Sequence, residues 1–132
     1  MSRGFALVPA LFLVVVLAAL GAAAIRIGNG EQQTVTMAMQ QVRALAAARA
    51  GIEWGAYQAL KASRCAASTT LNLSEAALAG FTVVVTCSSA IDASGPVPKN
   101  AYVLVANSSS GTYGQPGYVH RVVSSTFTDA TG

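Results

Sequence analysis

Hydrophobic positions divide the chain into segments of different pattern, and the first is a continuous apolar run. Residues 5–25 contain no charged side chain. As a helix, this run of 21 residues rises about 31 Å, which matches the hydrocarbon core of a bilayer. The run therefore predicts a helix that spans or anchors in a membrane.

A helical pattern of polar and apolar positions follows a short glycine-containing segment. Gly28 and Gly30 flank Asn29, and such a segment favours a break or a melted turn in a helix. Residues 31–62 then predict an amphipathic helix, whose apolar positions fall within a sector of about 80°. They are Val35, Met39, Val42, Ala46, Ala50, Tyr57 and Leu60. Most of the stability of a helix in a protein comes from packing of its apolar face, so we expect the stripe to pack on the remaining chain.

Two charged residues lie close to this apolar stripe. Arg49 and Glu53 are four residues apart, a spacing at which side chains on a helix meet. They are a candidate helix ion pair. One interpretation is a partly exposed pair at the edge of the stripe, and the other is a pair that meets a neighbouring subunit.

The second half of the chain has the pattern of strands. Residues 81–87, 101–107 and 117–128 are rich in β-branched and aromatic residues and are bounded by Gly, Pro, Ser and Asn. They predict three strands of an antiparallel meander within residues 81–128. The expected fold class is α+β, with one long helix packed on a small antiparallel sheet of about three strands.

Composition and charge limit the classes of function. The 132 residues suit one small domain beyond the apolar run, and 53% of them are hydrophobic. The net charge is +3, and the eight basic residues are scattered. Nucleic-acid binding is therefore not indicated, whereas low charge density suits burial against lipid or neighbouring subunits.

The chain has two cysteines, Cys65 and Cys87. If the N-terminus directs export, the compartment is oxidising and the pair predicts a disulfide. Closing a loop of this length stabilises the fold by about 3 kcal/mol in the chain-entropy model. The alternative is a pair of buried free thiols in a cytosolic protein.

Candidate catalytic groups are few. His120 is the only histidine, and strand alternation places it on the face opposite Val119, where a lone histidine is usually structural. The sequence has no nucleophile elbow, phosphate-binding loop or cysteine and histidine spacing typical of a metal site. We expect no enzyme activity, no catalytic residues, no cofactor and no metal.

The extreme N-terminus leaves three interpretations open. Met1, Ser2 and Arg3 form a short basic leader that ends at Gly4 and is followed by the aromatic Phe5. Arg3 predicts a cytoplasmic N-terminus. However, the small residues 22–24 also suit an ordinary signal peptidase cutting after Ala24, and an uncleaved membrane anchor is the third interpretation.

The segments "GFALVPALFLVVVLAALGA" and "RALAAARAGIEWGAYQAL", with the leader and the cystine-bearing sheet, resemble type IV pilins and pseudopilins. The resemblance is most specific to MshP-like minor pilins of the mannose-sensitive haemagglutinin pilus. PilX-type and GspK-type proteins are similar in the first half only. It implies a prepilin leader at residues 1–4, cleavage by prepilin peptidase between Gly4 and Phe5, and N-methylation of Phe5. It also implies a transmembrane and assembly helix at residues 5–27 and a periplasmic body at 28–132.

The resemblance fails at one informative position. Major pilins carry a glutamate as the fifth mature residue, which is thought to neutralise the N-terminal amine of an adjoining subunit, and here that position is Pro9. A buried ammonium needs a charged partner. The resemblance therefore implies a minor subunit near the filament tip, and proline is tolerated in the first turns of a helix.

Partners and location follow from the resemblance. It implies contacts with other major and minor pilins, with prepilin peptidase, with the inner-membrane assembly platform, and with membrane lipid before assembly. The chain would be a single-pass inner-membrane protein with a periplasmic body, and later part of a pilus at the cell surface that contributes to adhesion or motility. The alternative function is a small exported binding or adhesion domain with an ordinary signal peptide or membrane anchor.

Overall fold

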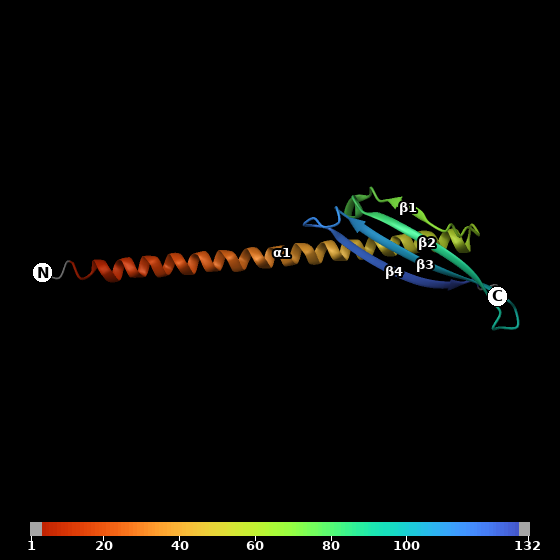
Figure 1. The fold of residues 1–132 in the computed structure, drawn as a ribbon, viewed down its shortest axis with the longest axis horizontal. Helices are drawn as coiled ribbons and strands as arrows, with labels where there is room; N and C mark the ends of the chain where they lie inside the picture. Colours follow the sequence, from red (N-terminus) through yellow and green to blue (C-terminus); the bar gives the residue numbers. More distant parts are fainter. Residues whose placement is uncertain (1–3, 130–132) are drawn as a thin grey trace. The chain divides into compact units, whose positions relative to one another are not determined.

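The computed structural model describes residues 4–129. The leader residues Met1, Ser2 and Arg3, with the orientation signal assigned to Arg3, lie outside the described residues. The element order is a helix α1 (Leu7–Leu60), strand β1 (Thr69–Asn72), a short 3-10 helix η1 (Ala76–Leu78), and strands β2 (Thr82–Asp92), β3 (Lys99–Ser110) and β4 (Val119–Thr128). The α+β class is confirmed (Figure 1).

The chain divides into two compact units, residues 1–38 and residues 39–132, and α1 contributes to both. We call the second unit the body.

The expected break at residues 28–30 is wrong, because α1 is helical through both Gly28 and Gly30. Each glycine costs a helix only about 1 kcal/mol relative to alanine, which does not interrupt a helix with well-formed turns on either side. The helix also ends at Leu60, two residues before the expected end at Ala62.

The sheet is an antiparallel meander with the order β1-β2-β3-β4. The three expected strands are present as β2, β3 and β4, and β1 adds a fourth that the sequence did not predict because it has only four residues. Strands β2 and β3 are also longer than expected, pairing from Thr82 opposite Ser109 to Asp92 opposite Lys99. Alanine and asparagine, which are among the residues that extend them, are depleted in strands, so local pattern predicts loops there.

In the body, α1 lies along one face of the sheet (Figure 1). The side of α1 that contacts the sheet is not the side that carries the apolar stripe. The buried residues of α1 are Ala44, Ala47, Ala48, Gly51, Ile52, Gly55 and Ala59. At 100° per residue these positions centre about 180° from the expected stripe. The prediction that the stripe from Val35 to Leu60 packs on the sheet is therefore wrong.

Small residues explain why this other face forms the contact. Ala47, Gly51, Gly55 and Ala59 recur every four residues, so they align on one side of α1 and let two backbones approach closely. A Cβ atom built on Gly51 would lie 2.6 Å from Cγ1 of Val83, and one on Gly55 would lie 3.1 Å from Cγ1 of Val85. The larger apolar residues of the stripe would hold the helix too far from the sheet.

The core between α1 and the sheet is completed by large residues from the strands. Val83, Leu104 and Ala106 are fully buried, and Val85 and Phe81, which directly precedes β2, are nearly so. Small helix residues and large strand residues therefore interdigitate, as close packing in protein interiors requires.

One polar side chain lies within this core. Ser108 of β3 is fully buried, and its Oγ donates a hydrogen bond to the backbone oxygen of Ala44 at 2.6 Å. The oxygen of Arg121 lies 3.3 Å away as a second acceptor for the same hydrogen. This bond ties α1 to β3, an inner strand of the sheet.

We expect Ser108→Ala to lower the free energy of unfolding by about 1 kcal/mol, because a buried hydrogen bond between helix and sheet is lost. Ser88→Ala is the matched control, since Ser88 is an exposed serine on β2. Denaturant unfolding of the full chain in detergent, followed by the fluorescence of Trp54, measures both variants. Equal effects of the two substitutions would contradict this role for Ser108.

Candidate functional site

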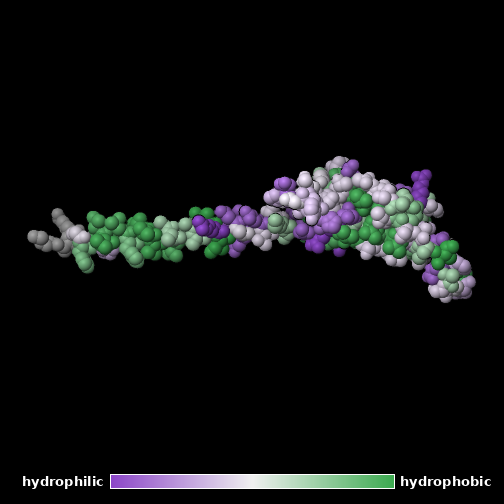
Figure 2. All heavy atoms as spheres, viewed as in Figure 1, coloured by the Kyte–Doolittle hydropathy of each residue, from purple (hydrophilic) through white to green (hydrophobic). Residues whose placement is uncertain are grey.

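The residues 5–25 of the apolar run lie on α1 and on the turn before it, with their side chains exposed almost throughout. Figure 2 shows these hydrophobic side chains covering the first part of α1. Among the described residues, α1 is the one helix long and apolar enough to cross a membrane by length and composition. By length and composition, a helix of this kind is suited to be a membrane anchor or a signal sequence.

The predicted cleavage position lies just before this helix. Gly4 and Phe5 belong to an exposed turn, and α1 begins at Leu7. The Phe5 side chain is 85% exposed. Cleavage between these residues and methylation of Phe5 remain predictions.

Pro9 lies within the first turn of α1. A proline at this place lacks an N–H group that would have no partner in the helix, so the helix is not interrupted. The first turn of α1 contains no acidic residue. The N-terminal end of the helix therefore offers no carboxylate to a neighbouring ammonium group.

In the body, the side of α1 opposite the sheet carries an exposed apolar surface. We call Met39, Val42, Ala46, Tyr57 and Leu60 the outer stripe, and all five are exposed. Val42 and Tyr57 are each 63% exposed. An apolar row of this kind on a helix is a candidate interaction surface.

Arg49 and Glu53 lie beside this outer stripe. Both side chains are exposed, and their positions on α1 place them on the side away from the sheet. They are therefore accessible to a neighbouring chain. The ion pair between them stays a prediction, in either of its two interpretations.

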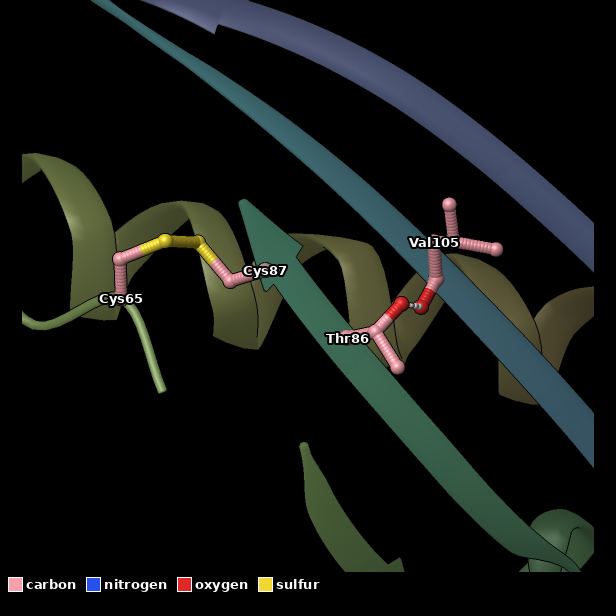
Figure 3. The surroundings of a disulfide bond; sticks show 4 residues. All are labelled: Cys65, Thr86, Cys87 and Val105. Atoms are coloured by element: carbon pink, nitrogen blue, oxygen red, sulfur yellow. Dashed lines mark hydrogen bonds between the residues drawn. A yellow bond between two sulfur atoms is a disulfide. The ribbon is translucent and has the colours of Figure 1, made fainter. Parts of the chain in front are cut away.

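The predicted disulfide is confirmed. Cys65 follows the end of α1 and Cys87 lies on β2, and their Cα atoms are 5.3 Å apart in the bonded pair (Figure 3). The neighbouring Thr86 donates from Oγ1 to the backbone oxygen of Val105 on β3. The disulfide therefore fixes the segment after α1 to β2. Both cysteines are bonded, so the alternative of two free thiols is wrong.

A groove of about 230 Å³ opens beside the disulfide in the body. Its lining includes Trp54, Gly55, Arg64, Val85 and Leu104. Trp54 is the only tryptophan in the chain, so its fluorescence reports on the contact between α1 and the sheet.

The hairpin tip between β2 and β3 contains a local hydrogen-bonded turn. Oδ1 of Asp92 accepts bonds from Oγ of Ser94 at 2.6 Å and from its backbone N at 3.0 Å. The hydroxyl bond, followed by the backbone bond and the nearby charge of Lys99, lowers the pKa of Asp92 below its ordinary value. Its contribution to stability is therefore present above the unfolded pKa and is lost as pH falls through the lower folded value.

Within residues 4–129, no three His, Cys, Asp or Glu side chains gather as a candidate metal site. His120 lies on β4 with its side chain exposed, while Val119 is buried, as strand alternation predicted. The small-residue face of α1 is the feature that the sequence analysis missed, and the four-residue spacing of Ala47, Gly51, Gly55 and Ala59 was the signal for it.

Comparisons with protein-family models, with curated proteins and with solved structures each found no match.

Proposed function

We propose that the chain is a minor pilin-like subunit that primes or caps a type IV pilus near the filament tip. Its role is structural and in assembly, without catalysis. The observation that carries the proposal is the exposed outer stripe on α1, in a helix whose first part is also apolar and exposed. A subunit that leaves the membrane to join a filament needs apolar helix surface for neighbouring helices.

The physics of assembly supports this role. In a bilayer, the backbone of the apolar segment is satisfied by its own hydrogen bonds and its side chains by lipid. In a filament, the same side chains contact neighbouring helices instead. Transfer exchanges one apolar environment for another and does not expose the run to water.

Position 9 holds a proline instead of the glutamate of major pilins, which supports a place for this subunit at the filament tip. A repeating subunit must offer a carboxylate to the N-terminal amine of the next subunit, because a buried ammonium without a partner is unstable. A subunit at the tip has no subunit ahead of it to neutralise. The predicted partners are therefore other pilins, with prepilin peptidase and the inner-membrane platform acting before assembly.

The proposal is tested by isolating surface filaments sheared from the native host. We expect the native chain in this fraction, in far fewer copies than the repeating subunit. Val42→Lys, which charges the outer stripe, is expected to reduce incorporation about tenfold or more because a buried unpaired charge is strongly destabilising. Val42 is exposed, so this substitution leaves the body folded.

Ser88→Lys is the matched control, since it places the same charge at an exposed position on β2. We expect it to be incorporated normally. Absence of the native chain from filaments, or equal incorporation of Val42→Lys, would contradict the proposed role.

A further inference from the structure

The turn between β3 and β4, residues 111–118, presents aromatic side chains to solvent. Tyr113 is 86% exposed, and its ring meets that of Tyr118 edge to face, with centroids 5.5 Å apart. The ring of Tyr118 lies nearly parallel to that of His120, with centroids 6.4 Å apart. We call these three residues the aromatic loop surface.

This turn is ordered by its own backbone. The N–H of Gln115 donates to the oxygen of Thr112 at 3.0 Å, and the N–H of Tyr118 donates to the oxygen of Gln115 at 3.2 Å. Gly111 has a φ of 83°, where a side chain is strained, and a Cβ there would lie 3.3 Å from Cα of Tyr118. The exposed Tyr113 is thus held on a defined turn, which lowers the entropy lost when a ligand binds.

The segment that carries the aromatic loop surface is uncharged and rich in polar residues. No Asp, Glu, Lys or Arg occurs between Lys99 and Arg121. Arg121 follows His120 on β4 and lies opposite Ser108, on the helix side of the sheet. Hydrogen-bonding groups are supplied instead by Thr112 and Gln115 of the turn and by Ser109, which pairs with His120.

These features select among possible ligands. A nucleic acid needs basic groups for its phosphates in addition to aromatic rings for its bases. A protein partner needs aromatic anchors within a larger buried apolar patch. An exposed aromatic ring with neutral polar groups at its margin fits a neutral sugar, whose ring face is apolar and whose edge carries hydroxyls.

We propose that the aromatic loop surface binds neutral hexopyranose chains, with one sugar ring stacked on Tyr113. Sugars with equatorial hydroxyls fit best, because their axial C–H bonds form flat apolar faces on both sides of the ring. Tyr118 and His120 support Tyr113, and the hydroxyls at the sugar edge bond to the polar groups of the turn. The site is separate from the outer stripe and does not depend on the assembly role.

The test is saturation-transfer NMR of the full chain in deuterated detergent micelles with cellohexaose as the probe. We expect transfer to be strongest at the axial ring protons of the sugar. Tyr113→Ala is expected to weaken binding about tenfold, since one aromatic contact is lost. Tyr113→Phe keeps the ring and is expected to retain binding.

Tyr57→Ala is the matched control, because Tyr57 is also exposed but lies on α1. Unchanged transfer in this variant supports the proposal, and circular dichroism verifies that each variant is folded. The proposal is overturned if the native chain gives no transfer to cellohexaose, or if Tyr113→Ala binds as the native chain does. Tighter binding of oligothymidylate than of cellohexaose would overturn it as well.

Discussion

Gly51→Leu is expected to lower the free energy of unfolding of the body by about 3 kcal/mol, because it overpacks the contact between α1 and the sheet. Even a single Cβ at this position would lie 2.6 Å from Val83 and 3.2 Å from the Cβ of Ala106. The remaining leucine atoms have no space, so the helix must move away from β2 and β3. Denaturant unfolding followed by Trp54 fluorescence measures the loss.

The matched control is Gly30→Leu. A side chain at Gly30 would meet no atom within 4 Å, and leucine is a better helix former than glycine by about 0.8 kcal/mol. We therefore expect no loss of body stability from this variant. If Gly51→Leu left body stability unchanged or raised it, as helix propensity alone predicts, the close-packing role of Gly51 would be contradicted.

Cys65→Ser is expected to lower the free energy of unfolding by about 3 kcal/mol, because the open chain gains entropy in the unfolded state. The disulfide links residues separated by 22 positions. We also expect Cys87 to become titratable by a thiol reagent once its partner is removed. Unfolding in detergent and thiol titration measure the two effects.

A double-mutant comparison isolates the covalent bond. Cys87→Ser is expected to have nearly the same effect as Cys65→Ser, and the double variant is expected to add little, because either single change already breaks the bond. Losses that add in the double variant would contradict the entropic role of the disulfide. They would indicate instead that each side chain stabilises the body through its own packing.

Much of this fold could be predicted from local patterns. β-branched runs predicted three of the four strands because those residues suit a half-buried sheet. The two halves of the long helix were predicted from the continuous apolar run and from apolar periodicity, although the break expected between them at residues 28–30 is absent. Strand β1 was missed, since four residues give too little pattern to identify a strand.

The packed face of α1 could not be found by ranking residues by hydrophobicity. Met39, Val42 and Tyr57 are the larger apolar side chains, yet they face away from the sheet. Gly51 and Gly55 contribute little apolar area, but their missing side chains make room for Val83, Val85 and Leu104. Shape decided the contact, and hydrophobic periodicity carries no information on shape.

This reversal bears on the proposed function. A stripe buried against the sheet would leave the body with no apolar helix surface for other subunits. Because the sheet packs on the small-residue face, the outer stripe stays exposed together with Arg49 and Glu53. The candidate site was therefore only partly accessible to sequence reasoning, which identified the stripe but assigned it to the core.

The N-terminal peptide of the chain purified from its native host tests the proposed function most directly. Mass spectrometry is expected to show Phe5 as the first residue, carrying an N-methyl group, because in the proposed role prepilin peptidase would cut after Gly4 and leave the apolar segment in the mature chain. A mature chain that begins at Ile25 would contradict the account, since an ordinary signal peptidase would then have removed that segment. Retention of Met1 would contradict it equally.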